Sequence, residues 1–509
     1  MGIISSCACT EIFAVLVTCV IGVITFFKWK FKYWERKNVP YITPHFPFGT
    51  MQNLFHPKVS FGVTIRNQYM ESKQKGLKHV GLFTLTKPTY MPIDLECVKS
   101  VLSSDFKHFV DRGVYHNEKD DPLSANLASL EGSRWKNLRT KLTPTFTSGK
   151  MKMMFPLLLE CGKQMIDALA EICDQSVPID IKDWLGRFGT DVIGTCAFGI
   201  DCNSFKEPNS DFRTYGKRAL YHTKWENAKI FLGFSNAKLA KKLGIRTTPV
   251  EVTNFFFKVI EDTVNRRRDD VVTRNDFLQI LLDLTNSTDE KNISEKQHLT
   301  IAELTAQAFL FFLAGFESSS TAMTFCLYEL AVNQDIQQRV REEIVSVLEE
   351  HDGVLTYETI KQMIYLKQVV DETLRKYPPV PHLIRRCVLD YKIPGTNIVI
   401  EKGTAAVVSA YGLHYDPEYH PDPEKFNPER FSASNKGKTK PFTYIPFGEG
   451  PRMCIGFRFG FMQVGVGLAL LLKNFRFTLS DKTNVPLRMN PQSFVLSVVD
   501  DIWLNLHKI

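Results

Sequence analysis

The sequence has no paired spacing of cysteines. Its eleven cysteines are an odd number, they are scattered between Cys7 and Cys454, and none of them forms a C-x-x-C motif. A disulfide framework needs cysteines that pair, and a structural zinc site needs closely spaced ligands. The sequence therefore predicts a protein of a reducing compartment, without disulfides and without a zinc site.

A strong net charge, internal repeats and low-complexity tracts are also missing. The formal net charge is +8 over 509 residues, with both signs interspersed, so nucleic acid is not an expected partner. Such a charge suits an anionic membrane surface or an acidic protein partner. Hydrophobic residues make up 44% of the chain and charged residues 23%, which is ordinary for a globular protein with a large core. We expect residues 50–509 to form one domain.

No basic residue precedes the apolar run of residues 12–27, and Glu11 stands at its start. A cleaved signal peptide would begin with a basic segment. Basic residues instead follow the run, at Lys28, Lys30, Lys32, Arg36 and Lys37. The positive-inside rule therefore favours an uncleaved transmembrane anchor at residues 1–28, with the N-terminus in the lumen and the remaining chain in the cytosol.

Residues 29–49 are basic and rich in proline. Pro40, Pro44 and Pro47 interrupt any continuing helix, because proline lacks an N–H donor and restricts the residue before it. The composition predicts a stiff hinge between the anchor and the main domain. Two glycosylation sequons, at residues 286–288 and 292–294, should stay unmodified if the predicted topology is right.

One short segment carries the strongest chemical signal. Residues 447–456 read F-G-E-G-P-R-M-C-I-G, and residues 455–473 predict a helix because they are apolar and lack proline. Cys454 would then lie at a helix N-terminus, where free N–H groups and the helix dipole stabilise a thiolate, and Arg452 adds positive charge. An isolated cysteine is usually a small buried hydrophobe, but these neighbours favour a metal-binding thiolate.

A long helical pattern runs from Thr300 to about Asn333, and Thr300 with Glu303 predicts a capping box at its start. Its middle, residues 309–318, reads F-L-F-F-L-A-G-F-E-S and is apolar on all sides, which predicts a buried helix. A carboxylate and a hydroxyl are costly in such a place unless they serve a purpose. By itself the pattern also fits a core helix with a partly exposed polar patch.

The pattern F-x-x-G-x-R-x-C-x-G resembles the heme-binding loop of the cytochrome P-450 superfamily. The resemblance implies that Cys454 is the axial thiolate ligand of a heme b iron. It also implies a mainly α-helical fold with small β-sheets, in which heme lies between the long central helix and the cysteine loop. Contacts with this cofactor are implied for Phe447 and Gly456 in the loop, and for Ala314 and Gly315 in the long helix.

The A-G-F-E-S run of the long helix resembles the oxygen-activating motif of that family, A-G-x-[DE]-T. Glu317 and Ser318 are then expected to be catalytic, by organising the water that delivers protons to bound dioxygen. Ser318 stands where the family usually has threonine. Because the missing methyl leaves the hydroxyl rotamer less restricted, oxygen use is expected to be less tightly coupled to product.

Two further motifs imply a structural charge network behind the heme. Glu372 and Arg375 match the E-x-x-R motif of the family, and residues 426–431, F-N-P-E-R-F, match the segment that supplies a second arginine, Arg430. Taken alone, an i, i+3 ion pair on a helix means little and would be solvated charge.

Trp135 and Arg139 lie four residues apart and therefore share one helical face. Without the resemblance they would belong to an amphipathic surface helix. The resemblance implies that they meet a heme propionate, and it implies the same for Arg385 and Arg452. Arginine suits this task because its fixed fork matches a carboxylate.

Substrate contacts can be predicted only by position in the resemblance. An ordinary core role suits the same residues equally well, and together they imply an apolar, partly aromatic pocket. The candidates are Phe309, Phe312, Val380, His382, Leu383, Phe494 and Val495.

The motifs cover nearly the whole chain in the order of the family, and they look most like its microsomal, insect detoxification-type branch. The resemblance implies a heme-thiolate monooxygenase at residues 50–509, which inserts one atom of O2 into apolar small molecules, either xenobiotics or endogenous lipids. No dinucleotide- or flavin-binding module is visible, so electrons from NADPH would come through a separate NADPH–cytochrome P-450 reductase. Whether cytochrome b5 also donates electrons stays open. The implied location is the endoplasmic reticulum membrane, with a single-pass anchor and a cytosolic catalytic domain.

Two other functions are considered. One is a heme-thiolate isomerase or dehydratase that needs no reductase, against which the intact Glu317 and Ser318 argue. The other is a non-catalytic membrane protein that binds heme or another ligand, and none of the motifs favours it.

Overall fold

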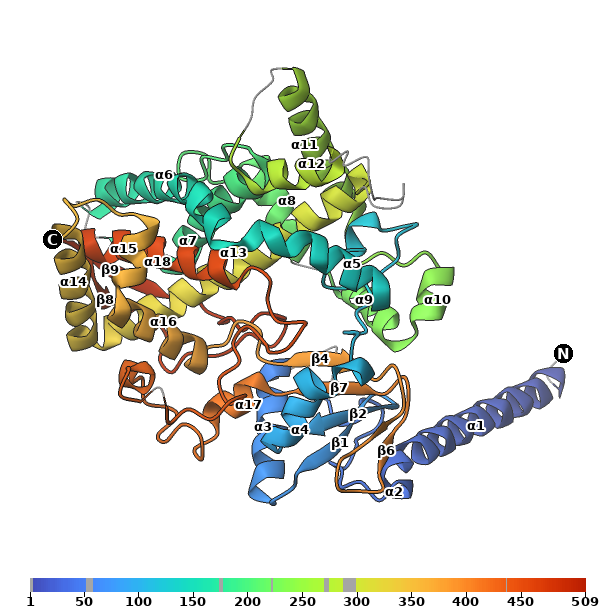
Figure 1. The fold of residues 1–509 in the computed structure, drawn as a ribbon. Coiled ribbons are helices and arrows are strands. Elements are labelled where there is room, and N and C mark those ends of the chain that lie inside the picture. Colours follow the sequence, from blue (N-terminus) through green and yellow to red (C-terminus); the bar gives the residue numbers. More distant parts are fainter. Residues whose placement is uncertain are drawn as a thin grey trace, which may run out of the picture.

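The computed structural model describes residues 3–51, 58–173, 177–220, 223–269, 274–286, 299–435 and 437–509. Helices form most of the molecule, and the largest sheet lies towards one side of it, called the sheet side below (Figure 1). The predicted mainly α-helical fold with small sheets is therefore confirmed. The two sequons fall largely outside the described residues.

The apolar helix α1 (Ile3–Phe31) projects from the molecule on the sheet side (Figure 1). The other described helices are α2 (Tyr33–Arg36), α3 (Phe61–Gln74), α4 (Leu95–Lys99), α5 (Gly132–Leu142), α6 (Ser148–Cys173), α7 (Ile181–Ile193), α8 (Asp211–Leu220), α9 (Lys224–Ser235), α10 (Ala237–Lys242), α11 (Val250–Asp269), α12 (Phe277–Asn286), α13 (Ile301–Val332), α14 (Gln334–Glu349), α15 (Tyr357–Gln362), α16 (Ile364–Lys376), α17 (Ala410–Tyr415) and α18 (Phe457–Asn474).

The described strands form three small sheets, and the largest has the order β1-β2-β7-β4. In that sheet β1 is antiparallel to β2, β2 is parallel to β7, and β4 is antiparallel to β7. A second sheet has the order β3-β9-β8, and β5 pairs with β6 in a hairpin. The strands are β1 (His79–Thr84), β2 (Lys87–Pro92), β3 (Ile179–Asp180), β4 (Leu383–Arg386), β5 (Tyr391–Lys392), β6 (Val399–Ile400), β7 (Ala405–Val408), β8 (Phe475–Leu479) and β9 (Trp503–Lys508).

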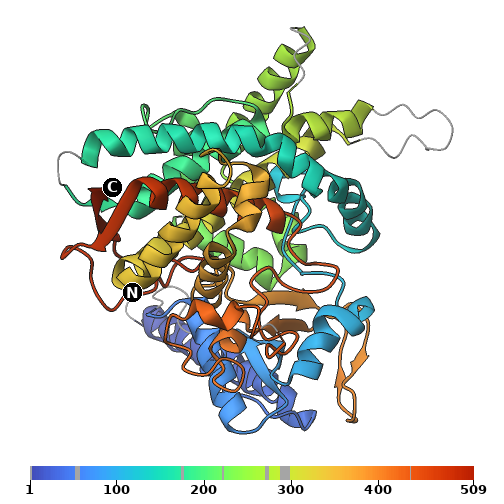
Figure 2. The same cartoon turned by 60° about the vertical axis from the view of Figure 1, so that its left-hand side comes forward.

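Helix α13 runs through the centre of the helical part and packs against α7, α16 and α18. The predicted capping box is present, since Glu303 N donates to Thr300 Oγ1 at 3.1 Å and Thr300 N donates to Glu303 Oε2 at 3.0 Å. The second half of the helix is almost wholly buried. Most of the apolar core forms around α13, and Figure 2 shows α6 lying alongside α18.

Helix α18 begins two residues later than predicted, at Phe457, with Gly456 at its N-cap position. It remains buried along its second half, so it is a core helix and not a second membrane span. By contrast, residues 10–31 of α1 form an apolar segment that is not buried within the protein. This segment is compatible with the predicted anchor.

The structure differs from the predicted hinge at residues 29–49. Trp34 is fully buried, and residues 40–50 pair with strand β1 through bridges at Tyr41–Gly81 and Gly49–Thr84. This stretch therefore belongs to the packed domain. The sequence could not show this, because proline breaks a helix without preventing an extended segment from pairing at a sheet edge.

The predicted charge network is assembled behind the cysteine helix. Arg375 donates two hydrogen bonds to the Glu372 carboxylate, at 2.8 and 2.9 Å, and both side chains are fully buried. Arg430 Nε lies 3.4 Å from the same carboxylate, and Asn427 N donates to it at 2.9 Å. Arg375 also donates to the carbonyl of His414 at 3.0 Å, so the network joins α16, α17 and the 426–431 segment.

Replacing Glu372 by glutamine should destabilise the protein by about 3–5 kcal/mol, because Arg375 would stay buried without its counter-charge. Glu429→Gln is a matched control, since the Glu429–Arg339 pair is 45% and 57% exposed and should contribute about 0–1 kcal/mol. Urea unfolding of the full chain in detergent measures both changes. Equal destabilisation by the two variants would contradict the structural role of the buried network.

Candidate functional site

Cys454 lies in a tight loop just before α18. Its backbone N–H donates to the carbonyl of Phe447 at 2.8 Å, and Met453 N donates to Gly450 at 3.0 Å. Gly450 has a φ of +74°, and a side chain there would overlap the backbone of Leu102. The loop therefore requires glycine at this position, both for its conformation and for its close contact with the neighbouring segment.

The thiol of Cys454 has an open side even though protein surrounds it. Among the cysteines whose side chains the structure describes, only Cys454 and Cys19 of the anchor helix are exposed. Burial nevertheless raises the pKa of Cys454, while the N–H of Gly456 and the guanidinium groups of Arg112 and Arg139 act to lower it. The positive surroundings predicted for the thiolate are present, but desolvation outweighs them. A positive metal ion bound to the sulfur would favour the anion.

Helix α13 has an accessible face in its middle. Ala314 is exposed although it lies in a helix that is otherwise largely buried, and Leu310 and Ser318, four residues away on either side, are partly exposed. Residues spaced by four share one face of a helix. Gly315 lies off this face, since a side chain there would contact Ile193 of α7 at 2.5 Å, so its small size serves the packing of α7.

The two predicted catalytic side chains lie next to this face. Ser318 Oγ donates to the carbonyl of Ala314 at 2.6 Å, which holds the hydroxyl in one orientation and leaves its lone pairs free to accept a proton donor. Burial raises the pKa of Glu317, and the positive charges of Lys182 and Lys217 partly oppose the shift. Glu317 therefore holds a proton at higher pH than an ordinary glutamate does.

Phe309 and Phe312 point away from the accessible face. Phe312 contacts Phe198, Phe212, Phe256 and Phe316 with ring centroids 5.2–6.4 Å apart, and Phe309 packs on Phe256 at 5.0 Å. These are the contacts of core residues, which was the alternative interpretation of both positions. Leu310 and Leu313 are apolar residues of α13 that are partly exposed near the accessible face.

Two arginines hold the cysteine loop by its backbone. Arg139 Nη1 donates to the carbonyl of Met453 at 2.9 Å, and Arg112 Nη2 donates to the carbonyl of Arg452 at 3.0 Å. These carbonyls belong to the two residues before Cys454 in the chain, so the bonds fix the position of the thiol. Burial lowers the pKa of Arg112 and of Arg139, and Cys454 acts in the opposite direction on both.

Arg452 is 2% exposed, and its guanidinium forms hydrogen bonds to the protein backbone. It donates to the carbonyls of Val110, Leu127 and Leu130 at 2.9, 3.3 and 2.9 Å. Its guanidinium carbon lies 3.9 Å from the ring of Trp135, which is also buried. Arg452 and Trp135 thus join the cysteine loop to the 110–130 segment and to α5. Their contact with a heme propionate stays a prediction.

Arg385 is buried on strand β4 with an incomplete set of partners. One bond goes to the carbonyl of Ile384 at 2.9 Å, and its Nε has no partner. Burial, with a further contribution from Arg112, lowers the pKa of Arg385 to about 9. Within the described residues, none of Arg112, Arg139 and Arg385 forms an ion pair with a carboxylate, so the site has uncompensated positive charge.

This arrangement fits the group that the sequence implies. A heme b needs a soft ligand for its iron and positive partners for two propionates, and the site offers the accessible sulfur of Cys454 with three arginines that lack carboxylate partners. Cys454 would hold the iron, and Arg112, Arg139 and Arg385 would hold the propionates. Sequence reasoning missed Arg112, because no motif surrounds it and only the fold brings it to the cysteine loop.

The remaining predicted substrate positions come together beside the loop. Leu383 lies 3.6 Å from where a side chain on Gly448 would be, and Leu496 N donates to the carbonyl of Pro379 at 2.9 Å. The ring of Phe494 lies 5.8 Å from that of His382, so the 380–384 and 494–496 segments are neighbours. Burial lowers the pKa of His382 to about 4, which keeps its ring neutral at pH 7. Val380 and Val495 lie partly exposed in the same two segments.

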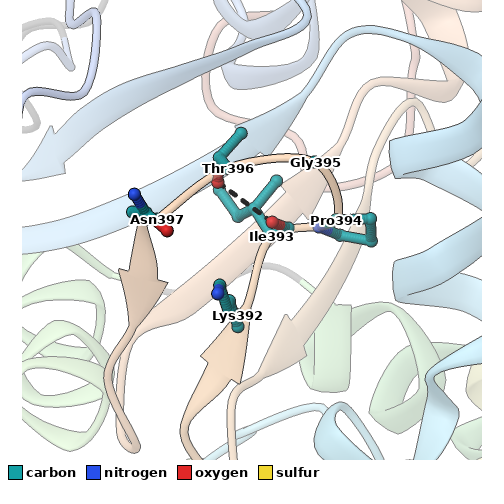
Figure 3. Close-up of a pocket in the computed structure, with 6 residues that line it drawn as sticks. All are labelled: Lys392, Ile393, Pro394, Gly395, Thr396 and Asn397. Atoms are coloured by element: carbon teal, nitrogen blue, oxygen red, sulfur yellow. Dashed lines mark hydrogen bonds between the residues drawn. The ribbon is translucent and has the colours of Figure 1, made fainter.

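A separate hollow lies at the turn of the β5–β6 hairpin, lined by residues 392–397 (Figure 3). Its lining comes from one turn alone, and the close-up shows Thr396 bonded to the carbonyl of Ile393 at 2.9 Å within that turn. No catalytic candidate contributes to it. The predicted site of chemistry remains the region around Cys454.

Comparison with known proteins gives one consistent result. The family model for cytochrome P-450 matches residues 42–503. Cytochrome P-450 6a2 of Drosophila melanogaster is 43% identical over 489 residues, covering 94% of this chain and 96% of the relative. Cytochrome P-450 6A1 of Musca domestica is 42% identical over 490 residues, with 95% of each chain covered. Cytochrome P-450 6a8 of Drosophila melanogaster is 40% identical over 508 residues, covering 99% and 100%.

Cys454→Ser should abolish the red-shifted Soret band of the reduced, carbon monoxide-bound protein, because a serine hydroxyl cannot supply the thiolate. Cys387→Ser is the matched control, since Cys387 is a buried thiol that donates to the backbone carbonyl of Leu389. It should keep the band. A band retained in Cys454→Ser would exclude Cys454 as the ligand.

Arg112→Gln should release heme to apomyoglobin roughly tenfold faster or more, since a hydrogen bond to a charged group contributes about 1.5–3 kcal/mol. Arg458→Gln provides the control, because Arg458 is exposed on α18, where it reaches the carbonyl of Phe146 at 3.4 Å and lies 4.9 Å from the ring of Phe457. Stopped-flow absorbance gives both rates. If the two variants lost heme equally fast, Arg112 would have no role in retaining it.

Proposed function

The chain belongs to the cytochrome P-450 family, and we propose that it oxidises apolar small molecules, either xenobiotics or endogenous lipids, with electrons from a separate NADPH–cytochrome P-450 reductase. Membership makes the chain a heme-thiolate monooxygenase and agrees with its resemblance to the insect branch. When bound, heme with a cysteine thiolate on its iron activates O2, from which one oxygen atom enters the substrate.

The observation that carries the proposal is the accessible thiol of Cys454 among arginines that lack carboxylate partners. The protein holds its cofactor there by charge, and it keeps Ser318 and Glu317 on or next to the accessible face of α13. Ser318 is positioned to accept a hydrogen bond, and Glu317 is able to carry a proton at that place. Their role would be to hold a proton and pass it along the accessible face of α13.

The proposed substrate class rests on the apolar side chains near the site. Leu310 and Leu313 border the accessible face of α13, while Leu383 lies against the cysteine loop. Phe494 is 67% exposed and has an uncharged ring, and His382 is neutral at pH 7. Neither side chain would therefore pair with an ionic substrate. Apolar molecules with few polar groups suit such surroundings.

The proposed electron donor is an acidic protein that meets α5. This helix turns Trp135 and Arg139 inward, whereas Lys136, which directly follows Trp135, is exposed. Arg458 is exposed at the start of α18. Positive charge on the outer side of the elements that hold Cys454 would bring an acidic donor close to the heme. Cytochrome b5 is a second proposed donor, and it is acidic as well.

The proposed location is the endoplasmic reticulum membrane, with the catalytic domain in the cytosol. Residues 10–31 are long and apolar enough to span a bilayer, and Lys28 and Lys30 lie in the last turn of α1. The positive-inside rule places this end of the span on the cytosolic side. Absence of glycan at the two sequons in cells would agree with this orientation, whereas glycan on either would reverse it.

In a membrane system with added reductase, an apolar substrate should increase NADPH consumption and yield an oxygenated product. Glu317→Gln should keep the carbon monoxide spectrum but lower the rate of product formation by roughly 10²-fold, because a proton carrier is lost. Ser318→Thr should raise product per NADPH, because the added methyl restricts the hydroxyl rotamer.

Two outcomes would support the alternatives. Conversion of an organic peroxide without NADPH or reductase would indicate an isomerase or dehydratase. Binding of apolar ligands without any product, in a protein with an intact thiolate spectrum, would indicate a ligand-binding protein.

A further inference from the structure

The junction between the anchor helix and the domain is packed like a core. Trp34 is fully buried, and its indole Nε1 donates to the carbonyl of Leu82 at 2.9 Å. The ring fits because residue 81 is glycine, since a side chain there would lie 2.5 Å from the indole. A buried tryptophan with a satisfied N–H holds its segment firmly, because moving it exposes a large apolar surface.

Backbone pairing continues the attachment beyond Trp34. Ile42 N donates to the carbonyl of Gly81 at 3.0 Å, and Gly81 N donates to the carbonyl of Pro40 at 2.8 Å. Thr50 N then donates to the carbonyl of Phe83 at 2.8 Å. Residues 40–50 therefore cover the otherwise open edge of β1, which is the edge strand of the four-stranded sheet.

A pair of polar contacts fixes the other side of α2. Lys37 Nζ lies 2.7 Å from Glu401 Oε1, and Tyr33 OH donates to Glu401 Oε2 at 3.0 Å. Glu401 follows strand β6, far along the chain. The first residues after the anchor are thus held by the buried ring of Trp34, by pairing with the edge strand β1 and by the carboxylate of Glu401. These three attachments involve different elements.

The anchor helix itself touches the domain. Phe31 packs on Phe83 of β1, with ring centroids 5.4 Å apart, and Phe27 packs on Phe46 at 4.8 Å. Phe27 ends the apolar run of the anchor, so Phe46 must lie at the same depth as that end of the span. Phe46 is 59% exposed, which leaves most of its ring available to lipid.

The surroundings of Phe27 and Phe46 have the composition of a membrane interface. Trp29 is 56% exposed, with the ammonium of Lys30 at 4.9 Å and the guanidinium of Arg36 at 5.2 Å from its ring. Aromatic rings with basic neighbours are enriched where a span meets the headgroups. Three exposed aromatic side chains, those of Trp29 in the anchor and of Tyr41 and Phe46 in the domain, are together called the collar.

We propose that residues 31–50 form a fixed joint, which seats the collar of Trp29, Tyr41 and Phe46 in the headgroup layer and holds the catalytic domain in one orientation on the bilayer. The proposal rests on the proposed membrane-spanning role of α1. It assigns a lipid-contacting function to the loop around Phe46, and it replaces a hinge by a rigid connection. The bilayer is the committed partner because Phe46 is in ring contact with the span.

The first experiment measures depth in full-length protein reconstituted into phosphatidylcholine–phosphatidylserine nanodiscs. A nitroxide amino acid replaces Val20 in the anchor, Phe46 in the collar or Val354 in the loop before α15, which is 53% exposed. Collision rates with oxygen and with a water-soluble nickel chelate report the depth of each label. Residues 20 and 46 should be shielded from nickel, and residue 354 should be accessible to it.

The outcomes distinguish a failure of the membrane anchor from a failure of the seated collar. Nickel access at residue 20 would mean that α1 does not span the bilayer, so the anchoring would fail together with the joint. Shielding at residue 20 with full nickel access at residue 46 would leave the anchor intact and overturn the seated collar.

The second experiment measures rigidity by pulsed electron spin resonance between labels at residues 20 and 389, where Leu389 is 50% exposed on the domain. The unmodified joint should give one narrow distance distribution, and Trp34→Ala should broaden it at least twofold. Trp29→Ala is the matched control, since it removes an exposed tryptophan that packs on no strand, and it should leave the width unchanged.

A milder variant protects the test against loss of folding. Glu401→Gln removes only the charge that Lys37 meets, and it should broaden the distribution less than Trp34→Ala while the carbon monoxide spectrum stays intact. A broad distribution in the unmodified protein, or equal widths in all four proteins, would overturn the fixed joint.

Discussion

Uncompensated positive charge around Cys454 is the constraint on which the centre of this protein depends. Three guanidinium groups, those of Arg112, Arg139 and Arg385, are held near the cysteine loop without a carboxylate partner among the described residues. Backbone carbonyls accept some of their N–H groups, which lowers the cost of burial but leaves the charge uncancelled. An anionic cofactor removes that cost and at the same time completes the hydrogen bonding. Cofactor binding and stability would therefore be coupled through the same side chains, since Arg112 and Arg139, which fix the loop, are also proposed to hold the cofactor.

The long helix α13 packs in the core on one side and borders the proposed reaction site on the other. One side carries Phe309 and Phe312, whose rings interlock with aromatic side chains of α8, α11 and the segment after α7. The other side carries Ala314, whose small side chain leaves room beside the backbone. Ser318 bonds to the carbonyl of Ala314, so the hydroxyl is held by the residue that creates the opening. The aromatic packing on one side of α13 therefore holds the accessible side in place.

Sequence patterns predicted the features that are determined by residues close together in the chain. The capping box at Thr300 and the α18 helix after Cys454 each depend on a few neighbouring residues, and both are present. The partner of a side chain across the fold was harder to predict. Arg112 has no local motif, and the burial of Trp34 depends on a glycine 47 positions later. Phe309 and Phe312 sit on a helix that is apolar on all sides, so periodicity gave no direction for either ring.

The four-stranded sheet connects the membrane joint to the reaction site. Strand β1 forms one edge of the order β1-β2-β7-β4 and holds Trp34 and the segment after the anchor. Strand β4 forms the other edge, where Leu383 lies against the cysteine loop and Arg385 reaches the uncompensated site. Neighbouring strands lie about 4.7–4.9 Å apart and resist shear through their hydrogen bonds. A joint fixed at one edge of this sheet therefore sets the height and tilt of the cysteine loop at the other edge. For a protein whose proposed substrates dissolve in lipid, a flexible hinge would let the distance between bilayer and active site vary, whereas this sheet keeps it constant.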